Sequence, residues 1–436
     1  MKPTLRPLYL ALLAVAVAVI SSCGGGSGSS AVVAAAPATV FSCTATAPAG
    51  TNAVTLAVDA GPTDPTTGML LSNVVNQSYV TINVYVPGAV PGTGHCQTID
   101  HVWVDTGSTG LRLFHSAFTD TLPQSQQAGA VVASCTQFVN SYTWGAVRSA
   151  DVRIAGELAS SVPIQVIGDA SVPATAPSSC SSGTTAMNTA AMMGANGLLG
   201  IGLFSQDCGT LCVAPATAPA GFYYTCPGGT CTPVNMAAAA QLQNVVGLFT
   251  TDNQGVLIQL PAIPDAGQAT ATGALIFGVN SQTNNQLGSA VVFAASTNGF
   301  INSTTTYGDM SEPESYIDSG SNGWFFNDTA IANCPGTSGF FCPPTSPTAL
   351  MATMEDATSS VSFTYNFNIA SESTLSTTFA AFNDLGGPSG TCDNTNPATL
   401  CTFDWGLPFF YNRSVFTLFE QTTLGGTNGS FAASTP

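Results

Sequence analysis

Two short segments, far apart in the chain, share a pattern that can do chemistry. In each, apolar or aromatic residues lead into Asp-(Thr/Ser)-Gly-Ser. One copy predicts only a strand that enters a tight turn, where Asp and Ser cap the backbone and Gly supplies unusual dihedral angles. Two copies suggest a pair of carboxyl groups, each at the end of an apolar strand. The two loops are Asp105-Thr106-Gly107-Ser108 and Asp318-Ser319-Gly320-Ser321.

Two carboxyl groups in contact can activate a water molecule. They cannot both ionise easily, so they share one proton over a working pH range. The ionised member can take a proton from a trapped water while the protonated member hydrogen-bonds a substrate carbonyl. Because Asp105 and Asp318 would need no metal, nucleophilic side chain or cofactor, we expect none.

A second pair of similar segments supports a duplication. The segment Ala195–Ile201 lies about 94 residues past Asp105, and Thr402–Leu407 lies about 87 residues past Asp318. Two motifs at matched spacing in both halves predict a duplicated lobe. If the lobes pack about a pseudo-twofold axis, Asp105 and Asp318 meet in the cleft between them.

The elements that must position these loops are predicted to be strands. Short alternating apolar runs with β-branched residues and frequent turn signals are typical of a mostly β protein. The clearest helix candidate is Val234–Val246, because it holds four consecutive alanines, and a second begins near Thr348. We therefore expect an all-β fold with a few short helices. Strands are expected at 79–86, 151–154, 162–167, 256–260, 274–279 and 362–369.

Composition limits the possible partners. The 436 residues include 6 Lys+Arg against 23 Asp+Glu, which gives a formal net charge of −17. This balance argues against nucleic acid, whose backbone requires Lys and Arg contacts, and against an anionic membrane surface. Charged residues make up only 7% of the chain, so there are few ion pairs for acid to break. Such a surface is compatible with activity at low pH.

The N-terminus has the pattern of an export signal. Two positive charges in residues 1–6 precede an apolar run over 8–20 that is too short to span a membrane. The run ends in Ile-Ser-Ser-Cys23, which resembles a bacterial lipobox. A lipoprotein signal peptide is therefore expected at 1–22, with a lipidated Cys23 and a flexible linker at 23–70. A simple cleaved signal with Cys23 as a bystander is the alternative.

The other twelve cysteines agree with export to an oxidising compartment. Four close couples predict small loop-closing disulfides, although spacing alone does not fix the pairing. The couples are Cys208/Cys212, Cys226/Cys231, Cys334/Cys342 and Cys392/Cys401. The first two could instead form a zinc site in a reducing compartment. Three histidines near the first loop could also suggest a metal, but they lack a close ligand spacing and are interpreted as structural: His95, His101 and His115.

Together these motifs resemble the bilobal, pepsin-like aspartic proteases of bacteria. They also resemble bacterial lipoproteins of unassigned function that carry the same motifs. The match covers most of residues 71–436 and implies an N-terminal lobe over 71–280 and a C-terminal lobe over 281–436. By position, Asp105 and Asp318 would be catalytic, Ser108 and Ser321 would orient them, and the two loop glycines would allow close approach. The turns that brace the loops would be Leu198-Leu199-Gly200 and, less perfectly, Asp404-Trp405-Gly406.

Some features depart from that family. The best candidate for the substrate-covering flap is Tyr142-Thr143-Trp144-Gly145, and it looks short because the return strand is expected at Asp151. Arg112 stands where the family has an aromatic residue that steadies the flap. The usual basic pro-segment is missing, since residues 24–70 contain no Lys or Arg.

Three functions fit these observations. The first is a lipid-anchored aspartic endopeptidase of the bacterial cell envelope, at the outer membrane. It would be a monomer acting on peptides or proteins, with the lipid as its only membrane contact. The second is an inactive protease-like lipoprotein that binds peptides or glycans between the lobes. The third, a purely structural surface protein, leaves the two matching loops unexplained.

Overall fold

The structure is a computed structural model. It describes residues 43, 48, 50–89, 95–118, 120–213, 221–265, 267–305, 311–336, 339–390, 392, 394–396, 400–420, 422, 424 and 428–434. The signal peptide expected at 1–22, the lipidation site Cys23 and the start of the expected linker lie outside these residues. In the described part, no helix is long and apolar enough to cross a membrane.

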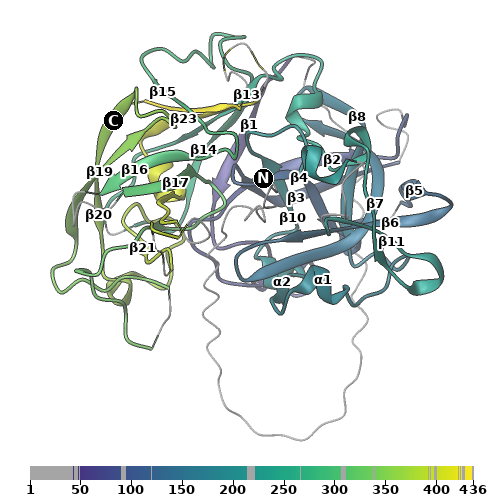
Figure 1. Ribbon diagram of the computed structural model, residues 1–436, viewed down its shortest axis with the longest axis horizontal. Coiled ribbons are helices and arrows are strands. Elements are labelled where there is room, and N and C mark those ends of the chain that lie inside the picture. The colour runs from purple at the N-terminus through teal and green to yellow at the C-terminus, as the bar shows by residue number, and fades with distance from the viewer. Residues whose placement is uncertain are drawn as a thin grey trace, which may run out of the picture.

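Strands make up most of the regular structure (Figure 1). In chain order they are β1 (Ala53–Val58), β2 (Ser78–Tyr85), β3 (Cys96–Asp105), β4 (Thr109–Phe114), β5 (Gln126–Gln127), β6 (Ala130–Gln137), β7 (Ser141–Ile154), β8 (Glu157–Ile167), β9 (Thr185–Ala186), β10 (Gly197–Ile201), β11 (Tyr223–Thr225), β12 (Thr232–Pro233), β13 (Gly255–Leu260), β14 (Ala271–Phe277), β15 (Val291–Ala294), β16 (Ile301–Thr305), β17 (Ser311–Ile317), β18 (Trp324–Phe325), β19 (Thr348–Glu355), β20 (Ser362–Ile369), β21 (Gly386–Gly387), β22 (Asp404–Trp405), β23 (Arg413–Leu418) and β24 (Ser430–Ala433).

Helices are few and short. The α-helices are α1 (Ser178–Ser181) and α2 (Ala190–Met193). Short 3-10 helices complete the regular structure: η1 (His115–Ala117), η2 (Gly209–Cys212), η3 (Pro227–Gly229), η4 (Ala238–Ala240), η5 (Val246–Leu248), η6 (Glu372–Thr374) and η7 (Leu407–Phe410). The predicted all-β class is confirmed. Each of the six strands predicted from alternating residues is found, in β2, β7, β8, β13, β14 and β20.

The two halves repeat one arrangement around their Asp loops. In the first half, β10 runs parallel to β3 and antiparallel to β4, so it fills the space between the strands that flank the first loop. In the second half, β22 runs parallel to β17 and antiparallel to β18 in the same way. This shared topology confirms two related β lobes.

The lobes are joined through shared strands. One sheet of 17 strands contains β1–β15 together with β23 and β24, while β16–β22 form a seven-stranded sheet. Within the larger sheet β13 pairs with both β14 and β23. Figure 1 shows these strands between the two halves of the molecule.

One part of the expected linker is ordered in the sheet. Strand β1 falls inside 23–70 but pairs with β14 over its full length and with the start of β2. All residues of its sequence, AVTLAV, except Thr55 are apolar, and Leu56 and Val58 are fully buried. The flexible-linker prediction is therefore wrong for Ala53–Val58.

Both helix predictions are also wrong. Within Val234–Val246 only the single turn η4 and the first residue of η5 are helical, because the side chains that follow η4 are held by tertiary contacts. Gln241 donates to the carbonyls of Gly209 and Met236, and Asn244 donates to that of Gly202. These bonds override the helical preference of the alanine run. The segment beginning at Thr348 is strand β19, which pairs along its length with β20.

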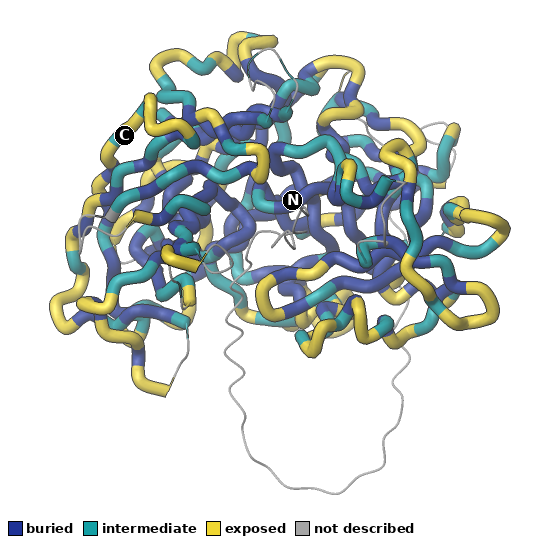
Figure 2. The backbone as a smooth tube through the Cα atoms, viewed as in Figure 1, coloured by how far each residue is buried: buried dark blue, intermediate teal, exposed yellow. Residues whose placement is uncertain are grey.

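Buried residues form a continuous interior through both lobes, and exposed residues gather at the outer loops (Figure 2). Six disulfides close the structure, and the four close couples are among them. Cys43–Cys96 and Cys135–Cys180 link residues 53 and 45 positions apart. Because the four cysteines of the alternative zinc site are disulfide-bonded to one another, they offer no thiolates to a metal.

Candidate active site

Asp105 and Asp318 stand at equivalent places in the two lobes. Asp105 is the last residue of β3, and Asp318 follows β17 directly. Gly200 of the bracing turn lies opposite Asp105, and a Cβ atom on it would be 2.7 Å from the Ser108 hydroxyl oxygen. This segment, which the structure places in strand β10 and not in a turn, therefore packs directly against the first loop.

The structure brings the two loops into contact. A Cβ atom built on Gly107 would lie 2.6 Å from Cγ of Asp318, and one on Gly320 would lie 2.6 Å from Oδ1 of Asp105. Each aspartate therefore faces the glycine of the opposite loop. Both Asp105 and Asp318 are fully buried, at 0% exposure.

Each carboxyl group is held by its own loop in the same way. The backbone N–H groups of Gly107 and Gly320 donate to Oδ1 of the aspartate two residues earlier, at 2.8 and 2.7 Å. The Ser108 hydroxyl donates to Oδ2 of Asp105, and the Ser321 hydroxyl donates to Oδ2 of Asp318 at 3.0 Å. In each loop the serine hydroxyl therefore holds the second oxygen of its own aspartate.

The second residues of the two loops bond the lobes to each other. The Thr106 hydroxyl donates to the carbonyl of Ile317 at 3.2 Å and accepts from the N–H of Ser319 at 2.9 Å. The Ser319 hydroxyl donates to the carbonyl of Val104 at 2.8 Å and accepts from the N–H of Thr106 at 3.2 Å. This reciprocal exchange fixes the spacing of the two aspartates.

The environment keeps a proton on the pair. Burial raises the pKa of Asp318 well above its usual value, and the negative charge of Asp105 raises it further. The N–H of Gly320 opposes this shift. One carboxyl of the pair is therefore protonated where an ordinary aspartate would be ionised.

A buried arginine, which sequence reasoning placed only as a departure, supports the first loop. Arg112 is fully buried, and its guanidinium donates to the carbonyls of Thr109 and Gly110 at 3.0 and 3.1 Å. Its Nε donates to the hydroxyl of Thr136 on β6 at 3.0 Å. Burial lowers the pKa of Arg112, and the charges of Asp207 and Asp105 raise it. Arg112 therefore connects the start of β4, which follows the first loop directly, to β6.

The candidate flap residues lie inside a strand. Strands β6 and β7 form a hairpin, and Gln137 pairs with Tyr142, so the turn comes before Tyr142. Trp144 packs edge-on against Tyr224, and a Cβ atom on Gly145 would be 2.1 Å from the carbonyl oxygen of Val166. The return strand begins at Ser141 and not at Asp151. Tyr142, Trp144 and Gly145 therefore do not form the tip of this hairpin.

Two of the histidines near the first loop face carboxylates. His95 lies 3.7 Å from Asp120, and His101 lies 3.4 Å from Asp59 and 3.1 Å from Asp100. The two acidic partners raise the pKa of His101 to about 9, although burial opposes this. In the described ranges, Glu372 lies near Cys334 and Cys342 in a group with metal-ligand spacing, but these cysteines form a disulfide.

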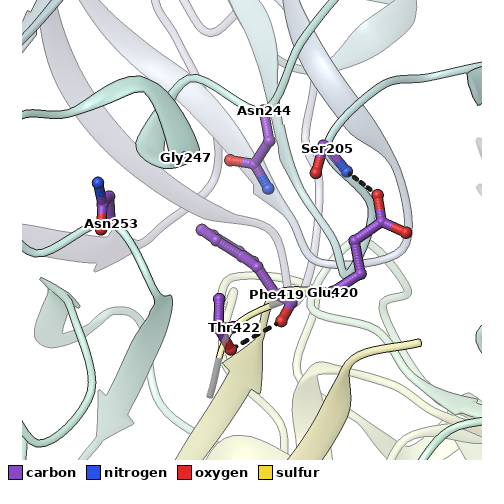
Figure 3. A pocket seen from close by; sticks show the side chains of 7 residues that line it. All are labelled: Ser205, Asn244, Gly247, Asn253, Phe419, Glu420 and Thr422. Atoms are coloured by element: carbon purple, nitrogen blue, oxygen red, sulfur yellow. Dashed lines mark hydrogen bonds between the residues drawn. The ribbon is translucent and has the colours of Figure 1, made fainter. Parts of the chain in front are cut away.

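A separate polar pocket of about 200 Å³ lies where the segment after β10, at Ser205, meets the segment after β23, at Phe419 and Glu420 (Figure 3). Glu420 accepts a hydrogen bond from the N–H of Ser205 in its wall, at 2.8 Å. Asn244 and Phe419 also line it. None of its lining residues belongs to the two Asp loops, so it is distinct from the aspartate pair.

Comparison with known proteins finds similar solved structures and one family. No curated protein matches the chain. A crystal structure of aspartic proteinase from Irpex lacteus is 14% identical, covers 88% of this chain and 97% of its own, and has a TM-score of 0.48. The model of a family described as "Protein of unknown function (DUF3443)" matches residues 48–434. The chain belongs to this DUF3443 family.

Proposed function

We propose that this protein is an aspartic endopeptidase that hydrolyses peptide bonds with Asp105 and Asp318. One observation carries the proposal: two buried carboxyl groups, from equivalent loops of two lobes, face each other and are bonded alike. A structural role for either loop alone would not require this pairing. The reciprocal bonds of Thr106 and Ser319 hold the pair at fixed spacing.

The proposed reaction uses one proton shared by the pair. Asp318 is the protonated member, because burial and its neighbour raise its pKa, and Asp105 is the base. Asp105 takes a proton from water as the water oxygen bonds to the peptide carbonyl carbon, while Asp318 gives its proton to the carbonyl oxygen. Asp105 then protonates the leaving nitrogen, the C–N bond breaks, and the hydroxyl proton returns to Asp318.

We also propose that Cys23 carries a lipid that holds a monomeric enzyme at the bacterial outer membrane. The lipobox resemblance and the six disulfides support export. Metabolic labelling with a fatty acid should mark the wild type and not Cys23→Ser. Labelling of both proteins, or of neither, would contradict the lipid anchor without bearing on the peptidase.

A binding protein without turnover is the second candidate. Two observations favour it: both aspartates have no exposed surface, and Arg112 replaces the aromatic residue expected beside the flap. The purified protein should be incubated with a peptide library from pH 3 to 7 and the products identified by mass spectrometry. Internal cleavage supports the endopeptidase. Retention of intact peptides or glycans without cleavage supports the binding protein.

A further inference from the structure

A third buried carboxyl group, that of Asp404, lies beside the aspartate pair. Strand β22 places Asp404 opposite Tyr316 of β17, and the next residue, Trp405, accepts from the N–H of Asp318 at 3.1 Å. Asp404 is 2% exposed, and the Ser321 hydroxyl is within its hydrogen-bonding reach. Because Ser321 also donates to Asp318 at 3.0 Å, one serine lies between the two carboxyl groups.

The first lobe has no such group. The residue equivalent to Asp404 is Leu198, which lies opposite Trp103, two residues before Asp105. In the same way Tyr316 precedes Asp318 by two residues. Leu198 is fully buried. The two loops are therefore alike in backbone and in their serines, but the second has a carboxyl group where the first has an apolar side chain.

The three carboxyl groups influence one another. Burial raises the pKa of Asp404 well above its usual value, the Ser321 hydrogen bond opposes this, and the charge of Asp105 adds to it. The charge of Asp404 in turn raises the pKa of Asp318. Its Oδ1 has no hydrogen-bond partner within the described ranges. Among the packed elements, β18 and η7 are apolar, and β17 contributes the other titratable groups, namely Glu312, Glu314 and Tyr316.

We propose that Asp404 is a positioning residue that acts through Ser321 and sets the pH range over which Asp105 and Asp318 share their proton. When protonated, Asp404 can donate to Ser321, which donates to Asp318. When ionised, it adds a like charge beside the pair, so the shared proton is held to a higher pH. Its consequence for catalysis rests on the proposed endopeptidase function, but its effect on the titration of the pair does not.

The test is a carboxyl titration of the whole protein by carbon-13 NMR of labelled aspartates. The signals of the pair are assigned from Asp105→Asn and Asp318→Asn. In Asp404→Asn the titration of the pair should move to lower pH by about one unit, because one neighbouring charge is gone. Asp404→Leu, which installs the residue of the first lobe, should move it in the same direction. Circular dichroism confirms that each variant is folded.

Glu312→Gln is the matched control. Glu312 is another fully buried carboxyl group, and burial raises its pKa to about 8, but it does not act on the pair. Its substitution should leave the titration of the pair in place. The proposal would be overturned if the titration of the pair did not move in either Asp404 variant, or if it moved equally in Glu312→Gln.

A pH–rate profile separates this inference from the proposed function. If the protein cleaves peptides, the alkaline limb of kcat/KM should move to lower pH by about one unit in Asp404→Asn. If Asp404→Asn cleaves peptides with the same alkaline limb as the wild type, and the aspartate pair titrates at the same pH in both, only the proposed role of Asp404 is rejected. A shifted titration in a protein that cleaves nothing would support that role and reject the endopeptidase.

Discussion

At the scale of single residues, the loop glycines determine whether the aspartates can meet. Gly107 and Gly320 each lie against the carboxyl group of the opposite loop, and neither has a backbone conformation that itself demands glycine. Both positions therefore require glycine because the opposite carboxyl group leaves no room for a Cβ atom. An added methyl group would have to push a carboxyl group that is already held by two hydrogen bonds.

Gly320→Ala should reduce peptide cleavage by about a hundredfold, because its Cβ would lie 2.6 Å from Oδ1 of Asp105 and displace it. The measurement is kcat/KM on a library-derived peptide. Gly247→Ala is the control, since the nearest atom to its Cβ would be 3.9 Å away, and it should retain full activity. Equal rates for Gly320→Ala and the wild type would show that the loops do not act together.

The sequence predicts the aspartate pair but not what joins its loops. Repetition of Asp-(Thr/Ser)-Gly-Ser identifies Asp105 and Asp318 because a duplicated motif implies a duplicated position. The bonds between Thr106 and Ser319 span 213 residues, and either side chain could equally cap its own turn. The packing of the two lobes determines that each side chain bonds to the opposite loop and not to its own turn. The sequence aligns Asp404 with Leu198 as an imperfect repeat, but it does not predict which groups surround the Asp404 carboxyl.

At the scale of elements, the first loop depends on the β6–β7 hairpin through Arg112. Three hydrogen bonds from Arg112 reach the carbonyls of Thr109 and Gly110, at the start of β4 directly after the loop, and the hydroxyl of Thr136. An aromatic side chain at this position could supply packing but not these three bonds. The hairpin is also tied down by Cys135–Cys180, so the arginine connects the loop to a fixed element.

Arg112→Met should lower the free energy of unfolding by about 3 kcal/mol or more, because it leaves buried acceptors unpaired at about 1–3 kcal/mol each. Urea unfolding with intact disulfides measures this change. Arg153→Met is the control: Arg153 is only partly buried, and its guanidinium lies 5.8 Å from the centre of the Tyr85 ring. Its loss should cost less than about 1 kcal/mol. Similar losses in both variants would contradict the role given to Arg112.

Strands are predicted more successfully than helices in this chain, for a physical reason. A strand such as β20 leaves a two-residue alternation that the sheet faces enforce, and the sequence displays it. The alanines of 237–240 carry only a local preference, which the buried bonds of Gln241 and Asn244 override. The flap was misplaced because the start of β7 is set by its pairing with β6, which the local sequence does not reveal.

At the scale of the whole molecule, buried acids dominate the response to pH. Burial raises the pKa of Asp207 to about 6, of Asp384 to about 7 and of Glu312 to about 8. The folded protein therefore binds more protons than the unfolded chain between about pH 4 and pH 8. Stability linked to these groups is fully present below their unfolded pKa values and is lost as the pH rises through the folded ones.

The free energy of unfolding should consequently fall between pH 4.5 and pH 8, measured by urea unfolding with intact disulfides. Glu312→Gln should remove about 2 to 5 kcal/mol of that fall, since each unit of pKa shift corresponds to about 1.4 kcal/mol. A stability that rises over this range would contradict the assignment of these acids as protonated in the folded protein.

The central claim is that Asp105 and Asp318 together hydrolyse peptides. The most direct measurement compares peptide-library cleavage from pH 3 to 7 by the wild type, Asp105→Asn and Asp318→Asn, with circular dichroism to confirm folding. We expect cleavage by the wild type and its loss in both variants, because each removes one partner of the shared proton. Undiminished cleavage by either folded variant, or none by the folded wild type, would contradict the claim.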